Sequence, residues 1–114
     1  MLIEQPPNIP HNISLNTWLQ RLVEQLFFTL TGSATWDPGS IADGDEEAKE
    51  VTVTGAQLGD FAVASFSLDV TDLVLDAQVT VADTVTCILS NNTGGAIDLG
   101  SGTLRVLVFR KEYV

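Results

Sequence analysis

Few side chains in this sequence could act as a nucleophile, a base or a metal ligand. The chain contains one histidine, His11, and one cysteine, Cys87. His11 lies in a proline-rich segment and Cys87 in the strand-like run 84–89, so the two are not expected to meet. Covalent catalysis needs a nucleophile beside a base, and a structural zinc ion needs several such ligands. We therefore expect a buried thiol at Cys87, and no catalytic residue, metal site or cofactor.

The acidic run 43–47 is the one cluster of side chains that resembles a ligand-binding loop. Asp43, Asp45 and Glu47 place carboxylates at alternate positions, as in part of a calcium-binding loop. The rest of that loop's spacing, including its closing glutamate, is missing. We interpret the run as a solvent-exposed loop, with a cation site as the alternative.

Two tripeptides, 12–14 and 91–93, match the pattern for asparagine glycosylation. Such short patterns often arise by chance, and the first residues of the chain do not resemble a secretion signal. We therefore give these matches no functional weight.

Charge and length limit the partners that the chain can have. Its 114 residues include 15 acidic and 5 basic ones, for a net charge of −10. Because phosphate groups are bound by clustered lysine and arginine, we expect no nucleic-acid partner. No apolar run approaches the length of a membrane span, so we expect no membrane partner either. A chain of this length suits a single domain. Because its first residues do not resemble a secretion signal, we expect it to be made in a cytoplasm.

The elements that would position functional residues fall into three segments. Residues 1–13 contain Pro6, Pro7 and Pro10, which lack backbone donors, so we expect an extended arm there. Such an arm is either a disordered tail or a tether that orders on a partner. The segment 14–33 is expected to contain a helix over 14–31, about 25 Å long, that ends at Gly32. Residues 34–114 are expected to form the strand-rich domain.

The predicted helix has one broad apolar face, whose residues recur at spacings of three and four. It is formed by Leu15, Trp18, Leu19, Leu22, Val23, Leu26 and Leu30. Each such side chain stabilises a protein by about 1.5–3 kcal/mol when buried, so the face must be covered. Either the chain's own sheets or other copies of the chain could cover it. Phe27 and Phe28 widen the face, which favours a bundle between copies, of two or three helices.

After the helix, the hydrophobic period changes to two. Alternating runs at 51–54, 73–81, 84–89 and 104–108 predict strands. In 73–81, one face would carry Leu73, Leu75, Ala77, Val79 and Val81. The run 61–66 is more continuously apolar than the others, which is typical of a central strand. With glycine- and asparagine-rich turns between the runs, the pattern predicts a mainly β domain, an antiparallel sandwich or barrel. Of the two, we expect a small antiparallel β-sandwich.

The last predicted strand is apolar on both faces. Leu107 and Phe109 lie on the face opposite Leu104, Val106 and Val108. A strand of this kind in a small sandwich suggests a buried contact between subunits. We therefore expect Leu107 and Phe109 to share the oligomer interface with the helix.

Several pieces of the strand-rich domain occur together, in the same order, in a known group of proteins. The pieces are residues 34–44 (ATWDPGSIADG), 51–60, 64–69, 82–86, 91–99 (NNTGGAIDL) and 102–106 (GTLRV). In these pieces, which span residues 34–110, the chain resembles small structural proteins of tailed bacteriophages. Trp36 would be a large anchor where the helix meets the sandwich, and Gly55, Gly59, Gly94 and Gly95 would supply turn conformations. The charged insert 45–50 departs from the family, in which small and hydroxylated residues are usual.

The resemblance implies a virion surface module, commonly trimeric, with a jelly-roll-like sandwich and a trimeric helix bundle. We expect a capsid decoration (cement) protein that binds the major capsid protein or another virion protein and stabilises the particle. It would lie on the capsid surface after assembly in the host cytoplasm, attached through Pro6, Pro7, Ile9 and Pro10 of the arm. The alternative is a tail-fibre or baseplate tip protein whose sandwich binds a host-surface glycan. Neither role is that of an enzyme.

Overall fold

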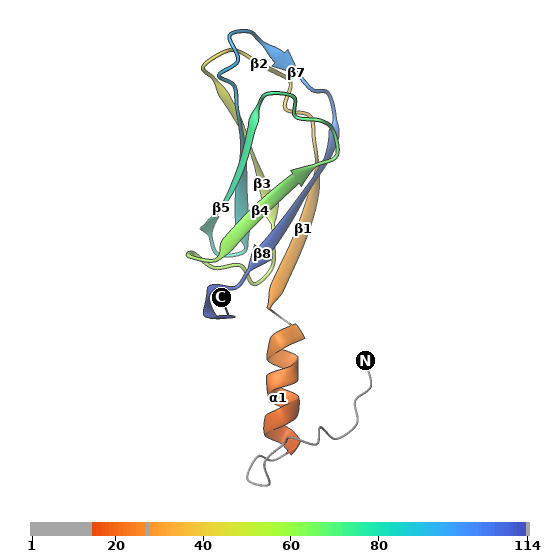
Figure 1. Cartoon of the computed structure of the whole chain (residues 1–114), viewed down its shortest axis with the longest axis vertical. Coiled ribbons are helices and arrows are strands. Elements are labelled where there is room, and N and C mark those ends of the chain that lie inside the picture. Colours follow the sequence, from red (N-terminus) through yellow and green to blue (C-terminus); the bar gives the residue numbers. More distant parts are fainter. Residues whose placement is uncertain (1–14, 27, 114) are drawn as a thin grey trace.

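The computed structural model describes residues 15–26 and 28–113 (Figure 1). Helix α1 is Leu15–Leu26, and the short 3₁₀ helix η1 is Lys111–Tyr113. The strands are β1 (Thr29–Trp36), β2 (Ser40–Ile41), β3 (Glu46–Thr52), β4 (Phe61–Phe66), β5 (Val74–Val81), β6 (Thr84–Ser90), β7 (Ile97–Asp98) and β8 (Gly102–Phe109). All strand pairs are antiparallel. The prediction of a mainly β chain with one N-terminal helix is therefore confirmed for the described residues.

The helix is shorter than predicted, and β1 begins where the helix was expected to continue. Helix α1 ends at Leu26 and β1 begins at Thr29, so the predicted helix over 14–31 is wrong for residues 29–31. Along its whole length β1 pairs with β8, from Thr29 opposite Phe109 to Trp36 opposite Gly102. This ladder satisfies the backbone groups of residues 29–31 in a strand, and Gly32 lies inside the strand instead of ending the helix.

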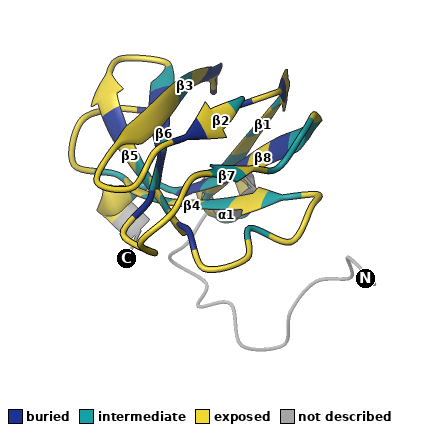
Figure 2. Ribbon diagram, turned by 90° about the horizontal axis from the view of Figure 1, so that it is seen from above, coloured by how far each residue is buried: buried dark blue, intermediate teal, exposed yellow. Residues whose placement is uncertain are grey.

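Two three-stranded sheets enclose the core (Figure 2). Their strand orders are β1–β8–β4 and β3–β6–β5, and β2 pairs with β7 in a separate two-stranded sheet. The buried side chains between the sheets include Leu104 and Val108 from β8, Val85 and Leu89 from β6, and Ile41 from β2. Burial of these large aliphatic side chains is the main stabilising contribution to the domain.

The central strands are β8 and β6, not β4. The continuous apolar run of β4 predicts a central strand, but β4 is at an edge of its sheet, paired only with β8. Its inward residues are Ala62, Ala64 and Phe66, whereas Phe61 and Val63 point outward and are 56% and 52% exposed. The run contains few polar residues because Phe61 and Val63 make most of the outer side of β4 apolar too.

The face predicted for strand 73–81 is correct as far as Val79. Leu73 and Val79 are buried, and Leu75 and Ala77 pack against the core. Val81 is 57% exposed, because the pairing of β5 with β6 shifts register between Val79 and Val81. An extra residue at such a bulge rotates the side chains that follow it to the other face.

Trp36 anchors the end of β1 that is distant from the helix, which corrects its predicted place at the helix junction. It closes the eight-residue strand β1, so it lies about 25 Å along the chain from Thr29. The indole is buried and meets the ring of Phe66 edge to face, with 5.8 Å between ring centroids.

Strand register gives the domain two distinct ends (Figure 1). Trp36, Ser90 and Gly102 lie at the end away from α1, which we call the far end. Thr29 and Phe109 lie at the opposite end, which we call the helix end. Helix α1 continues beyond the helix end and lies against neither three-stranded sheet (Figure 1).

The far end is strongly acidic. Its loops and strand ends, residues 37–47, 67–74 and 90–102, contain no lysine or arginine. They carry Asp37, Asp43, Asp45, Glu46, Glu47, Asp69, Asp72 and Asp98. The helix end instead mixes acidic residues with Arg110 and Lys111. The negative charge is therefore concentrated at the end of the molecule that is farther from the helix.

Buried Asn91 organises the far end and rules out one of the two glycosylation matches in the folded chain. Its amide nitrogen donates to the carbonyls of Ile41 and Gly95, and the residue has no exposed surface. The other match, 12–14, lies outside the described residues.

Among the predicted turn glycines, Gly55, Gly59 and Gly94 have positive φ, but Gly95 does not.

Candidate self-association surface

The apolar side of α1 is exposed at two of its described residues. Leu15 is 65% exposed and Leu19 is 41% exposed, while Trp18 and Leu22 are half-buried. These four residues follow the spacing of three and four that places them on one side of a helix. At 12 residues the helix is about 18 Å long, shorter than expected. Val23 and Leu26 continue the spacing in α1, but their side chains lie outside the described part of the structure.

Leu30 does not belong with this group. It lies in β1, points inward and packs against the core. Its spacing from Leu26 fits a helix, but its pairing with Val108 places it in the sheet. The predicted interface therefore loses Leu30. The predicted attachment residues Pro6, Pro7, Ile9 and Pro10 lie outside the described residues.

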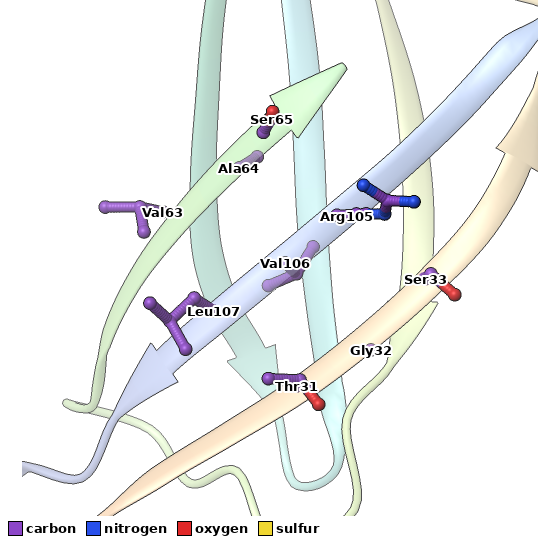
Figure 3. A pocket seen from close by; sticks show the side chains of 9 residues that line it. All are labelled: Thr31, Gly32, Ser33, Val63, Ala64, Ser65, Arg105, Val106 and Leu107. Atoms are coloured by element: carbon purple, nitrogen blue, oxygen red, sulfur yellow. The ribbon is translucent and has the colours of Figure 1, made fainter. Parts of the chain in front are cut away.

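A second uncovered surface is the outward side of the β1–β8–β4 sheet, which we call the outer face (Figure 3). Strand register arranges its side chains in cross-strand rows. The rows are Thr29–Phe109–Phe61, Thr31–Leu107–Val63, Ser33–Arg105–Ser65 and Thr35–Thr103. Apolar rows therefore lie nearest the helix end, and polar rows lie toward the far end.

Leu107 and Phe109 point outward from β8, on the face predicted for them, while Leu104, Val106 and Val108 are buried. Neighbouring β4 adds Phe61 and Val63, which belong to the run that was predicted to be a central strand. Their outward position could have been predicted from the alternation within 61–66. It places the small Ala62 and Ala64 on one face and the larger Phe61 and Val63 on the other.

The outer face is hollowed. A depression of about 660 Å³ follows β8, lined by residues of β1, β4 and β8. Figure 3 shows Arg105 and Leu107 on β8, between Val63 and Ser65 of β4 and Thr31 and Ser33 of β1. One part of the hollow is therefore aliphatic, and the other part carries hydroxyl groups and a guanidinium group.

Phe28 connects this face to the helix. Its ring meets that of Phe109 edge to face, with 5.8 Å between centroids. Its carbonyl accepts a hydrogen bond of 3.0 Å from the backbone nitrogen of Arg110. The chain just after α1 is thus held at the end of β8, beside the first apolar row.

The two outer sides of the domain differ in charge. The rows of the outer face contain one cation, Arg105, and no carboxylate. Arg105 forms no ion pair with another described residue. On the β3–β6–β5 sheet, register instead places Glu46, Glu50 and Asp76 on the outward side. The outer face is therefore an acid-free surface on a protein with a net charge of −10.

The acidic run 43–47 uses its oxygens to hold the backbone. The Asp43 carboxylate accepts a hydrogen bond from the amide of Gly94, and the Asp45 carboxylate accepts one from the amide of Glu46. Among the described residues, no group of three or more His, Cys, Asp or Glu side chains is placed to hold a metal ion. In the same part of the chain, no helix has the length and hydrophobicity needed to cross a membrane.

Comparison with known families finds no family model that matches the chain, and a search of curated proteins finds no significantly similar sequence. The two uncovered surfaces, the side of α1 and the outer face, are thus the features of the molecule from which a function can be inferred.

Proposed function

We propose that this protein is a structural component of a tailed-bacteriophage virion: a decoration (cement) protein that binds the capsid surface as a trimer and stabilises the particle. The observation that carries the proposal is the uncovered apolar side of α1, with Leu15 and Leu19 exposed on a helix that packs on neither sheet. Each leucine that is fully buried between copies would contribute about 1.5–3 kcal/mol. A bundle of three such helices covers these side chains without any contribution from the sheets.

The order of the strand pairs supports a jelly-roll-like sandwich. Strands β1 and β8, β2 and β7, and β3 and β6 pair in a nested series, as in a long hairpin folded over on itself. Nested pairs of this kind are typical of the jelly roll, a fold found in viral capsid proteins. The chain departs from the regular pattern where β4 pairs with β8 and β5 pairs with β6.

The distribution of charge supports an orientation on the particle. With α1 and the arm directed toward the capsid, the acidic far end would face solvent. Clustered negative charge there would keep neighbouring particles apart and soluble. We propose that the arm, through Pro6, Pro7, Ile9 and Pro10, makes the attachment to the major capsid protein.

The role of α1 can be tested with two substitutions that add the same charge. Leu19→Glu places a carboxylate among the apolar side chains of the proposed bundle, and we expect it to weaken association at least about tenfold. Gln20→Glu, on an exposed neighbouring residue, is the control and should leave association unchanged. Sedimentation velocity of each full-length variant measures the mass. A monomeric parent chain, or equal effects of the two substitutions, would refute the helix bundle.

The role of the arm can be tested on capsids. A chain that lacks residues 1–13 should keep the mass of the oligomer and lose binding to capsids that have been stripped of the protein. Co-sedimentation with capsids measures the binding. If the shortened chain binds as well as the parent, the arm is not the tether.

A second candidate function is a tail-fibre or baseplate tip protein that binds a host-surface glycan. The observation that favours it is the hollow of the outer face, which hydroxyl groups and Arg105 line, with the exposed Phe61 two rows from Arg105 on the same face. Aromatic rings and polar groups together are suited to sugars. Glycan-array binding that is lost in a Phe61→Ala variant would support this function over decoration of the capsid.

A further inference from the structure

We infer that the outer face of the β1–β8–β4 sheet, including the edge strand β4, packs against a second copy of this chain. This contact would hold the copies together beside the helix bundle. The inference rests on the self-association proposed above and adds the surface through which the sheet domains meet.

Exposed apolar side chains form one continuous surface on the outer face. Phe61 and Val63 are more than half exposed, and they flank Phe109 and Leu107 in the two rows nearest the helix end. Large apolar side chains that gather in adjacent rows on the outside of a small domain usually mark a contact with another molecule. The smaller Ser33 and Ser65 in the next row leave the hollow into which a neighbour's side chains can fit.

Charge identifies the occupant as another copy. Each copy carries a net charge of −10, so most pairs of surfaces would bring carboxylates together. The outer face has none in its rows, and Arg105 adds a positive charge at the border of the apolar rows. A strongly acidic chain can therefore meet its own copies through this surface without repulsion between carboxylates across the contact.

The apolar rows of the outer face lie close to the end of α1. Phe28 follows the helix closely in sequence, and its ring rests on that of Phe109 in the first apolar row. The apolar rows thus lie at the end of the sheet from which α1 departs. When helices of neighbouring copies associate, these rows are the parts of the sheets that are brought together first.

Thiol labelling can measure whether the face is covered. The only natural cysteine, Cys87, is fully buried, and its burial raises the pKa of the thiol to about 11, so it should not react in the folded chain. We would compare full-length Val63→Cys, on the outer face, with Gln78→Cys, an exposed position on the outward side of β5. A maleimide reagent would be added at a concentration at which sedimentation shows the oligomer.

We expect the Val63→Cys thiol to react at least about tenfold more slowly than the Gln78→Cys thiol, because a neighbouring copy covers it. The difference should disappear on dilution to the monomer. Equal rates in a chain that is oligomeric would overturn the inference and leave the helix bundle standing. A chain that is monomeric at every concentration would overturn both the outer-face contact and the helix bundle. Co-sedimentation with capsids would then test capsid binding separately.

Added charge gives an independent test. Ser65→Glu introduces a carboxylate into the outer face, and Gln78→Glu introduces the same charge on the opposite sheet. Both positions are exposed, so both variants should fold. We expect Ser65→Glu to raise the dissociation constant of the oligomer about tenfold and Gln78→Glu to change it little, because repulsion between like charges is strongest inside a contact. Equal effects of the two substitutions would contradict the inference.

Discussion

Asn91 shows how a single buried polar residue can organise one end of the domain. Its side-chain nitrogen donates to the carbonyls of Ile41 and Gly95, at 2.7 and 2.8 Å. Its side-chain oxygen accepts from the backbone amide and the hydroxyl of Thr93. All of the side chain's hydrogen-bonding capacity is thus used inside the protein, and strand β2 is joined to the turn after β6.

We predict that Asn91→Ala lowers the free energy of unfolding by about 1–3 kcal/mol, because the two carbonyls would be left without these donors. Urea unfolding followed by fluorescence of the tryptophans measures the change. Asn92→Ala, at the exposed neighbouring position, is the control and should have a much smaller effect. A similar loss in both variants would show that Asn91 has no special role.

Cys87 should make stability depend on pH in the alkaline range. Burial, with a smaller contribution from the charge of Asp76, raises the pKa of this thiol from 9.0 to about 11. The unfolded chain therefore releases the proton at lower pH than the folded chain does. The stabilising contribution is complete below about pH 9 and is lost as the pH rises toward 11.

The comparison that isolates this contribution is between the parent chain and Cys87→Ala. Urea midpoints measured from about pH 8 to about pH 11 should fall more steeply for the parent. The parent has a thiol that titrates over this range, and Cys87→Ala has none. Parallel pH profiles of the two proteins would contradict the assignment. The substitution also leaves a small cavity, which lowers stability equally at every pH and does not affect the slope.

At the scale of single elements, β1 is held close to the opposite sheet by the absence of a side chain at Gly32. A Cβ atom there would lie 2.5 Å from the carbonyl oxygen of Thr52 and 2.8 Å from a methyl carbon of Val53. We predict that Gly32→Ala costs about 1–3 kcal/mol of stability through this overlap, measured as the shift in the urea midpoint. Gly95→Ala, where no atom lies within 4 Å of the added carbon, should be close to neutral. Equal effects would show that β1 can move away without cost.

The chain after β8 is attached to the β3–β4 loop by Asp60. One carboxylate oxygen accepts from the amide of Lys111 and the other from the amide of Gln57, both at 2.9 Å. The ammonium group of Lys111 donates in turn to the carbonyl of Leu58. These contacts hold η1 against the helix end of the domain.

We predict that Asp60→Ala loosens this attachment, at a cost of about 0.5–1.5 kcal/mol. Hydrogen exchange of the amides of Gln57 and Lys111 should become faster, while exchange in the core strands changes much less. Asp72→Ala, in an exposed far-end loop, removes the same charge and should leave both amides unaffected. Unchanged exchange in Asp60→Ala would mean that other contacts hold η1.

For the whole molecule, the contrast between acidic and apolar surfaces should govern association. With a net charge of −10 on each chain, copies repel one another at low ionic strength. Raising the salt concentration from about 10 mM to about 150 mM shortens the Debye length from about 30 Å to about 8 Å. We predict that association becomes stronger over this range, measured by sedimentation velocity. Weaker association in salt would mean that charge pairs, and not apolar contact, hold the copies together.

Much of the β pattern can be predicted from the sequence, because alternation of side chains is a local property of a strand. The predicted run 61–66 coincides with β4, and runs 73–81 and 84–89 differ from β5 and β6 by one residue at one end. The two faces of β8 are also correct: Leu104, Val106 and Val108 are buried, and Leu107 and Phe109 point outward. The apolar side of α1, and Leu107 and Phe109 of the outer face, can therefore be predicted from the sequence, whereas Phe61 and Val63 of that face were not predicted.

The sequence by itself thus determined that the chain is mainly β, that a short amphipathic helix precedes the strands and that the last strand is apolar on both faces. Only the tertiary structure decided that residues 29–31 join a strand, that β4 lies at an edge, and that Val81 turns outward at a bulge. It also brought Phe61 and Val63 beside Phe109 and Leu107, more than 40 residues away in the sequence, to complete the outer face. Side-chain alternation depends on neighbouring residues, whereas strand order and register depend on partners far along the chain.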